Sequence, residues 1–404
     1  MKSCGLVVEY NPFHNGHLYH VKEARKITQA DVIIAIMSGS FLQRGEPAIV
    51  DKYHRTKMAL QSGVDLVIEL PYAFAVQNSR LFAKGAVQLL HALNSTHICF
   101  GSESGKIDPF MTHYKHMKQN KSQYQHTLKS LLSQGLSFPA ASKHALEITL
   151  PELSLDITKP NNILGFSYVK EILDANLPIQ IHTIKRIHND YHDVKITNSI
   201  ASATSIRTEL FKEKSSQQAI QSTIPQTTHK QLMSYKKKVG IWHHWEHYFP
   251  YLHYQVIKMS TNDLAQIEGV DEGIEHRLKR TATSANSFTD WMEQLKTKRY
   301  TWTRLQRMFV HILTHTTKQQ LEPLKELNKM PYIRVLGMNT IGQKYLNEQR
   351  NRRIAPFISR YSSNMHPLLA IEEKVSRVYY CPLPHNKQKK MIRQEFRGPI
   401  IERN

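Results

Sequence analysis

The chain has 404 residues, of which 40% are hydrophobic and 22% charged, so it can bury a sizeable core and we expect two or three domains. Lys and Arg number 54 against 33 Asp and Glu, a formal charge of +21, which favours nucleic acid as a partner over a membrane surface. A basic surface that serves solubility is the alternative. The short, interrupted apolar run near the first residue predicts neither a signal peptide nor a membrane span, so we expect a cytoplasmic protein.

Strand and helix signals alternate through the first hundred residues. Apolar runs predict buried strands over residues 4–10, 31–37, 64–71 and 96–101. Periodic patterns predict helices over residues 17–28, 51–63 and 79–94, and in the first of these Leu18, Val21, Ala24 and Ile27 are expected to face the core. This order predicts an α/β fold with a Rossmann-like, doubly wound parallel sheet, whose ligands bind outside the carboxyl ends of the strands.

The segment NPFHNGH, residues 11–17, lies between the first predicted strand and the first helix. Pro12 and the Asn15-Gly16 pair predict a tight turn, and Gly16 allows a close approach of backbone to a ligand. His14 and His17 then lie beside the free amides of a helix N-terminus, which is an arrangement suited to charge developing on a phosphate. Ordinary surface histidines are the alternative.

A second motif, SATSIRTEL, occupies residues 202–210. Its hydroxyl groups can cap a helix and donate to phosphate oxygens, and Arg207 supplies a forked guanidinium. An ordinary capped helix is the alternative. Together the two motifs resemble the H-x-G-H and S/T-x-x-I-R signatures of the HxGH nucleotidyltransferase superfamily, which includes adenylyltransferases and class I aminoacyl-tRNA synthetases.

Further segments look like one branch of that superfamily, the tRNA(Met) cytidine acetate ligase (TmcAL) family, over nearly the whole chain. They are VVEYNPFHNGHLYH, MSGSFLQRGEPAIVDKYHRTKMAL, GVDLVIELP, FGSE, PNNILG, IKR followed by YHD, and KTKRYTWTRLQR. The resemblance implies an ATP-dependent ligase that activates acetate as acetyl-adenylate and acetylates the wobble cytidine of elongator tRNA(Met) to N4-acetylcytidine. Alternatives are another adenylyltransferase that makes a nucleotide cofactor, and a non-catalytic RNA-binding protein on this fold.

The resemblance also implies an ATP site. It comprises Val7, Val8, Glu9, Tyr10, Asn11, Pro12, Phe13, His14, Asn15, Gly16, His17, Leu18, Tyr19, His20, Gly101, Asn161, Asn162 and Arg186, to which the second motif adds Ser202, Ser205 and Arg207. His14, His17 and Arg207 are the expected catalytic residues. Mg²⁺ is expected to arrive with ATP, and no metal ligand is predicted in the protein.

Several of these assignments have a structural alternative. Gly101 is also explained as a plain turn glycine, and Arg186 as an exposed charge at the end of a strand. One of Asn161 and Asn162 is expected only to cap a helix, and Asn161 is preferred as the ATP ligand.

The loop after the second predicted strand opens onto the same edge of the sheet. Gln43 and Arg44 in this loop are candidates for orienting acetate or the target base, and a purely structural loop is the alternative. Glu69 ends the third predicted strand and is not assigned to the site.

The chain is expected to divide into two regions. Residues 1–215 form the catalytic domain, with a helical insertion at about 105–160, and residues 230–404 form a mainly α-helical, basic, tRNA-binding region. Residues 211–238 lack apolar periodicity, so the boundary is expected near 215–235. The RNA-binding candidates, whose alternative is a solvated helical face, are Lys296, Lys298, Arg299, Tyr300, Arg304 and Arg307. The basic run at residues 386–397 is expected to be mobile.

Overall fold

The computed structural model describes residues 1–149, 155–157, 159–186, 201–212, 216–325, 327, 329–352, 354–362 and 366–403. The motif YHD, residues 191–193, lies outside them. One sheet forms the centre of the molecule, in the strand order β5-β4-β1-β2-β3-β6-β7, with β8 paired to β6. The strands are β1 (Ser3–Val8), β2 (Val32–Ser38), β3 (Leu66–Leu70), β4 (His97–Ser102), β5 (Gln180–Lys185), β6 (Ile333–Met338), β7 (Phe357–Ile358) and β8 (Ile400–Ile401).

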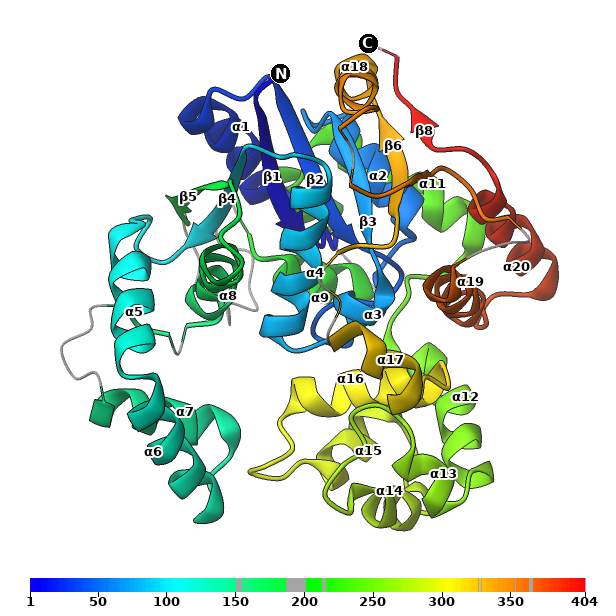
Figure 1. Cartoon of the computed structure of the whole chain (residues 1–404). Helices are drawn as coiled ribbons and strands as arrows, with labels where there is room; N and C mark the ends of the chain where they lie inside the picture. The colour runs from blue at the N-terminus through cyan, green and yellow to red at the C-terminus, as the bar shows by residue number, and fades with distance from the viewer. Residues whose placement is uncertain are drawn as a thin grey trace.

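Helices surround this sheet and extend below it (Figure 1). Those of the first half are α1 (Asn15–Thr28), α2 (Lys52–Leu60), α3 (Tyr72–Ala75), α4 (Ser79–Ala92), α5 (Asp108–Gln119), α6 (Lys121–Ser133), α7 (Phe138–Thr149), α8 (Pro160–Asp174) and α9 (Ala203–Phe211). Those that follow are α10 (Gln217–Thr223), α11 (Gln226–Val239), α12 (Trp245–Lys258), α13 (Thr261–Ala265), α14 (Ile274–Ala282), α15 (Phe288–Leu295), α16 (Trp302–Leu313), α17 (Lys318–Lys325), α18 (Thr340–Glu348), α19 (Pro367–Tyr379), α20 (His385–Ile392) and the 3₁₀ helix η1 (Arg393–Phe396).

The predicted α/β fold is confirmed. Strands β1 to β5 are parallel to their neighbours, and every residue of β2 and β3 is buried, as expected for strands covered on both faces. The expectation of a purely parallel sheet is wrong at one edge, because β6 runs antiparallel to β3. Strands β6 and β8 belong to the region that was expected to be mainly helical and separate, so that region completes the catalytic sheet.

Three local expectations are also wrong. Ile27 is 45% exposed, and Thr28 is buried in its place at the end of α1. Residues 211–238 are mostly helical, because α11 buries Leu232 and Tyr235 while its outer face carries lysines, which weakens the apolar pattern. The basic run at 386–397 forms α20 and η1, which are fixed by buried side chains rather than mobile.

A buried ion network joins the late strand β6 to the rest of the sheet. The Lys52 Nζ atom lies 2.6 Å from Glu69 Oε1 and 3.0 Å from Glu395 Oε2. The Arg334 guanidinium lies 3.1 Å from Glu69 Oε2 and 2.7 Å from Glu395 Oε2. All four side chains are at most 2% exposed, so two cations and two carboxylates compensate one another away from water. Glu69 is therefore part of the fold and not of the ligand site.

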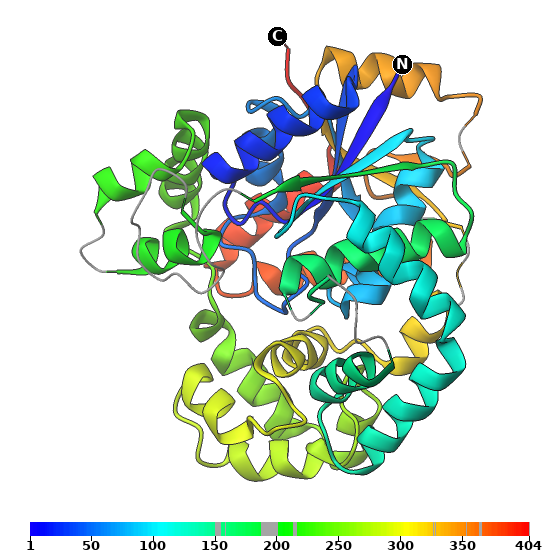
Figure 2. The ribbon, with the colours of Figure 1, turned by 90° about the vertical axis from the view of Figure 1, so that its left-hand side faces the viewer.

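Two groups of helices flank the lower side of the sheet. The insertion α5–α7 extends from the β4 edge, and α12–α16 form a layer beneath the sheet (Figures 1 and 2). Among the described residues, no helix is both long enough and apolar enough to cross a bilayer. The cysteines are free thiols: Cys4 and Cys99 are buried and Cys381 is partly buried.

Candidate active site

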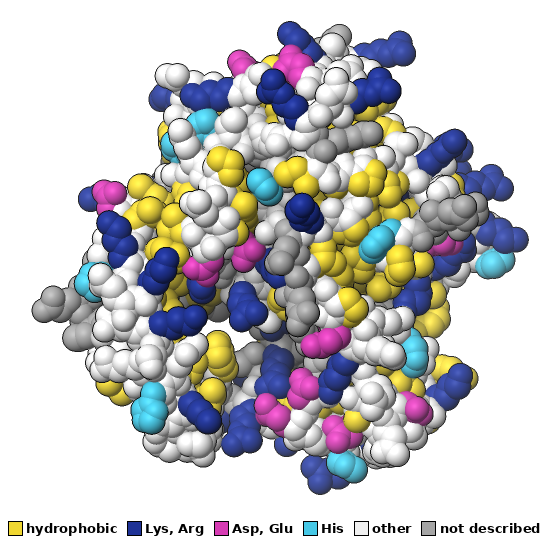
Figure 3. All heavy atoms as spheres, in the orientation of Figure 1, with side chains coloured by type: hydrophobic (Ala, Val, Ile, Leu, Met, Phe, Trp, Pro, Cys, Tyr) yellow, Lys and Arg dark blue, Asp and Glu magenta, His cyan; other side chains and the backbone are white. Residues whose placement is uncertain are grey.

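A cavity of about 940 Å³ lies at the carboxyl ends of β1 and β4. The first turns of α1, α8 and α9 supply one part of its wall, and α7 and α16 supply another. Lys and Arg side chains gather around the hollow between the insertion and the α12–α16 layer (Figure 3). The site therefore lies where a parallel sheet binds its ligands, with a positively charged entrance.

His14 and His17 hold the N-terminus of α1 in one defined geometry. His14 is the N-cap, and its Nδ1 accepts the Gly16 N–H at 3.0 Å. His17 Nδ1 accepts the His14 N–H at 3.2 Å, and the two rings stack with centroids 3.7 Å apart. Since both Nδ1 atoms accept hydrogen bonds, each neutral ring carries its proton on Nε2. Helix α1 thus begins two residues earlier than predicted.

Burial keeps these imidazoles neutral. Burial, reinforced by the Arg186 and Arg207 charges, lowers the pKa of His14 to about 3. Burial and the neighbouring histidines lower the pKa of His17 well below its usual value, and burial lowers the pKa of His20 to about 4. At neutral pH the pair is therefore a set of N–H donors rather than of cations. Positive charge in the site has to come from arginine.

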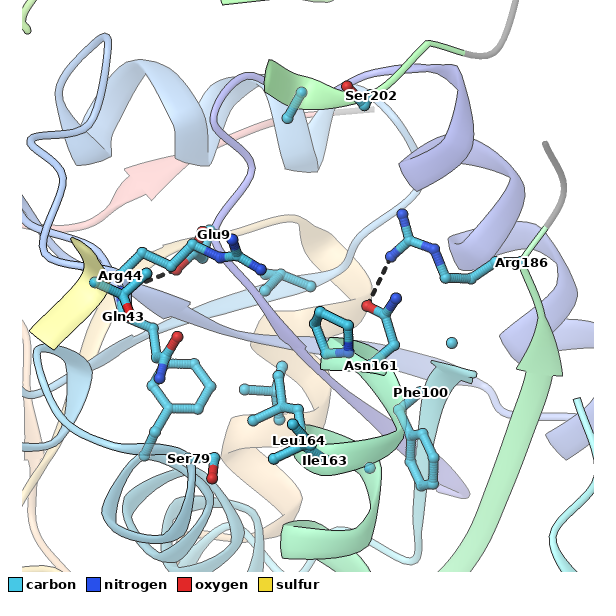
Figure 4. A pocket seen from close by; sticks show the side chains of 18 of the residues that line it. Glu9, Gln43, Arg44, Ser79, Phe100, Asn161, Ile163, Leu164, Arg186 and Ser202 are labelled. Carbon is cyan, nitrogen blue, oxygen red and sulfur yellow. Dashed lines mark hydrogen bonds between the residues drawn. The ribbon is translucent and has the colours of Figure 1, made fainter. Parts of the chain in front are cut away.

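Two arginines of the wall are held by specific partners. Arg207 donates to the Asn11 carbonyl at 3.0 Å and to Glu46 Oε2 at 2.8 Å. Arg186 donates to Asn161 Oδ1 at 2.9 Å, and Figure 4 shows this pair facing into the pocket. These contacts fix guanidinium groups beside the histidines, in a geometry suited to phosphate oxygens.

Gly101 and Gln43 shape the same wall. A Cβ atom at Gly101 would lie 3.2 Å from Arg186 Cγ, so the glycine lets the arginine pack closely over β4. The Gln43 side chain donates to the Gln77 carbonyl at 2.9 Å, and its backbone N–H donates to Glu9 Oε1 at 2.9 Å. Gln43 and Arg44 both line the cavity, on the side of the loop after β2.

The structure brings most of the predicted ATP residues into this wall. They are Val7, Val8, Glu9, Tyr10, Asn11, His14, Gly16, His17, Tyr19, His20, Gly101, Asn161, Arg186, Ser202 and Arg207. The others, Pro12, Phe13, Asn15, Leu18, Asn162 and Ser205, lie outside it.

Two of the residues outside the wall have structural roles instead. Asn162 is buried, accepts the Glu103 N–H and donates to the Asp156 carbonyl, so it holds a turn while Asn161 faces the ligand space. Ser205 is 1% exposed and donates to the Ser202 carbonyl at 2.9 Å, so its hydroxyl is used within α9. Thr204 takes the place in the wall that was expected for Ser205.

The RNA-binding candidates separate into three groups. Lys296, Lys298 and Arg299 are exposed on the loop between α15 and α16. Tyr300 is 4% exposed and its hydroxyl donates to the Asp271 carbonyl, so the expectation that this ring stacks on unpaired bases is wrong. Arg304 lies over the inner Tyr300 ring, 4.1 Å from its centroid.

Arg307 belongs to the cavity rather than to the outer surface. It lines the wall and donates to the Gln43 carbonyl at 3.4 Å. Burial lowers its pKa to about 10, so it remains a cation at neutral pH. It joins Arg44, Arg186 and Arg207 around the ligand space.

Sequence patterns did not reveal the apolar part of the wall. It comprises Phe82, Phe138, Ile157, Ile163, Leu164 and Tyr168. These residues come from three separate helices and one connecting segment, and each resembles an ordinary core residue in its own segment. Only the tertiary arrangement identifies them as ligand-facing.

Comparisons with known proteins agree with this geometry. Residues 1–395 match the family model described as HIGH Nucleotidyl Transferase. A protein of Oceanobacillus iheyensis named tRNA(Met) cytidine acetate ligase is 52% identical over 403 residues, which are 99% of this chain and 100% of that protein. The Bacillus subtilis protein of the same name is 46% identical over 400 residues, covering 98% of this chain and 96% of the relative.

Solved structures resemble the chain over its full length. The apo crystal structure of Thermotoga maritima TmcAL matches with a TM-score of 0.93 at 31% identity, covering 100% of both chains. The form of that protein bound with alpha-thio ATP matches with a TM-score of 0.90 at the same identity and coverage. The chain therefore belongs to the tRNA(Met) cytidine acetate ligase family of HIGH-type nucleotidyltransferases.

Proposed function

We propose that this protein is a tRNA(Met) cytidine acetate ligase, which uses ATP to activate acetate as acetyl-adenylate and then acetylates the wobble cytidine of elongator tRNA(Met). The observation that supports this most directly is the pair of neutral imidazoles and the anchored Arg207 at the N-terminus of α1, in one cavity. A cytoplasmic location is part of the proposal, because ATP and tRNA are both present there.

The first half-reaction joins acetate to the α-phosphate of ATP. An acetate oxygen forms a bond to the α-phosphorus while the bond from that phosphorus to pyrophosphate breaks, and pyrophosphate carries away the negative charge. His14 and His17 donate from Nε2, and Arg207 supplies positive charge, so the developing charge meets prearranged partners. No protein nucleophile is required for this step.

The second half-reaction transfers the acetyl group. The N4 amine of cytidine attacks the acetyl carbonyl carbon, the bond from that carbon to the AMP oxygen breaks, and N4 loses one proton as AMP leaves. We assign the docking of the RNA to the exposed cations Lys296, Lys298 and Arg299, because α16, which follows them, also lines the cavity.

Magnesium is expected to be carried by the ATP phosphates. Two carboxylates line the described part of the cavity, and both are engaged: Glu46 pairs with Arg207 at 2.8 Å, and Glu9 accepts the Gln43 N–H. Burial also raises the pKa of Glu9, which makes it a poor ligand for a cation. Mg²⁺ would supply charge neutralisation on the phosphates, and these residues would leave its coordination to phosphate and water.

Two assays test the proposal. Acetate-dependent exchange of labelled pyrophosphate into ATP measures the first half-reaction without RNA. Mass spectrometry of elongator tRNA(Met), incubated with the protein, ATP and acetate, measures N4-acetylcytidine. A protein that shows no acetate-dependent exchange, but is active with a mononucleotide as the acceptor of AMP, is instead a cofactor-forming adenylyltransferase.

A further inference from the structure

Phe138 is the first residue of α7 and is 61% exposed, although it is a large aromatic side chain. Farther along the same helix Ala141 and Ala145 are fully buried, and Tyr124 of α6 hydrogen-bonds to Ser142 at 2.9 Å. Helix α7 is therefore fixed on the insertion by its own contacts. The ring at its start does not contribute to that packing in proportion to its size.

Phe138 lines the same cavity as the catalytic histidines, and it differs from the other aromatic side chains there. Tyr10, Phe82, Phe100 and Tyr168 also line the cavity, and each is at most 6% exposed. Tyr19 is partly buried. Among the described residues of the wall, Phe138 is thus the aromatic ring that has a free face for a ligand.

The surroundings of Phe138 indicate a polyanionic ligand. Lys143, one helical turn farther along α7, lines the cavity as well. The turn before α7 reaches the basic loop of the C-terminal region, since a Cβ atom at Gly135 would lie 3.7 Å from Arg299 Nη2. Figure 1 shows the α6–α7 end of the insertion and the loop before α16 approaching each other. A strand of RNA held by that loop therefore passes Phe138 on its way to the histidines.

Acylation at N4 places a demand on the acceptor base. The exocyclic amine has to reach the acetyl carbon at the edge of the sheet, so the base must leave the stack of the anticodon loop. An unstacked base is stabilised on proteins by an aromatic ring, and this contact is worth about 1–3 kcal/mol per base by alanine substitution, or roughly 5- to 150-fold in affinity.

We infer that Phe138 is the stacking platform for the acceptor cytosine, positioned by the insertion opposite the basic loop. The inference rests on the proposed function, because it needs an RNA base as the second substrate. It assigns to the insertion a role in presenting the base, while ATP activation remains with α1, α9 and Arg186.

The test separates the two half-reactions in the full-length protein. We expect Phe138→Ala to leave acetate-dependent pyrophosphate exchange and the KM for ATP within twofold of wild type. The kcat/KM for tRNA acetylation should fall by tenfold or more, because the unstacked base loses its partner. Phe138→Trp should retain acetylation, and Phe138→Leu should lose it, since leucine is apolar but has no π face.

Ile148→Ala is the matched control. Ile148 lies on the same helix and is 59% exposed, but it is outside the cavity wall, so its variant should be unchanged in both assays. The inference is overturned if Phe138→Ala lowers exchange as much as acetylation, since the ring then serves ATP. It is equally overturned if Phe138→Leu matches wild type or if Ile148→Ala loses as much as Phe138→Ala. A wild-type protein without exchange removes the proposed function itself, whereas normal acetylation by Phe138→Ala removes only this inference.

Discussion

The replacement of His14 by asparagine separates two roles of one side chain. The Nδ1 atom of His14 caps α1 by accepting the Gly16 N–H at 3.0 Å, and Nε2 carries the proton that we assign to the phosphate. Asparagine is among the best N-cap residues, so His14→Asn keeps the cap and removes the distal donor. Loss of one prearranged donor to a developing oxyanion typically costs about 10²–10³ in kcat, or about 2.7–4 kcal/mol. We therefore expect acetate-dependent exchange to fall by that factor.

The companion variant His14→Ala removes the donor and the cap together. It should show a similar loss of exchange and, in addition, a loss of about 1 kcal/mol in the free energy of unfolding that His14→Asn does not show. Urea denaturation measures the second quantity independently of activity. Exchange by His14→Asn within threefold of wild type would refute the assignment of the distal nitrogen to catalysis. An equal loss of stability in both variants would refute the separation of the two roles.

Three further predictions follow from the buried charges and the basic loop. Burial lowers the pKa of His14 to about 3 and that of His20 to about 4, so the unfolded chain takes up these protons first; the urea midpoint should fall as the pH drops from 6.5 towards 4, and a rising midpoint would contradict this. Arg334→Met leaves two buried carboxylates with one lysine and should lower the free energy of unfolding by about 3–5 kcal/mol, whereas a loss below 1 kcal/mol in calorimetry or urea would argue that water enters the network. Reversal to Glu at Lys296, Lys298 and Arg299 should weaken tRNA binding and flatten its salt dependence by about one unit of slope per phosphate contact, with exchange unchanged; equal losses in binding and exchange would show that the loop acts on ATP.

Local patterns predicted the elements whose periodicity is undiluted. The strand β2 is a continuous apolar run and is fully buried, and α1 begins at the Asn-Gly turn after β1. Ile27 shows the limit of this reasoning, because it continues the apolar face of α1 beyond the point where the neighbouring elements still cover it, and it is 45% exposed. Helix α11 shows the opposite error, since its lysines hide a buried face from a pattern search.

Pairwise geometry, by contrast, could not be predicted from the motifs. The choice of Asn161 over Asn162 depends on which side chain the Asp156 carbonyl and the Glu103 amide engage. The inward Tyr300 ring depends on the Asp271 carbonyl, which is supplied by another segment. Such contacts are fixed by tertiary packing, and composition or spacing along the chain does not contain them.

The antiparallel pairing of β6 with β3 has a consequence for biosynthesis. While the ribosome is still translating the middle of the chain, β3 is an open edge, and Lys52 and Glu69 lack Arg334 and Glu395. An edge of this kind attracts other strands, and closing it requires segments far apart in the chain to meet, which is a slow step. The nascent nucleotide-binding half thus depends on chaperones or on rapid completion of synthesis, and an enzyme cut short before β6 is destined for aggregation or proteolysis.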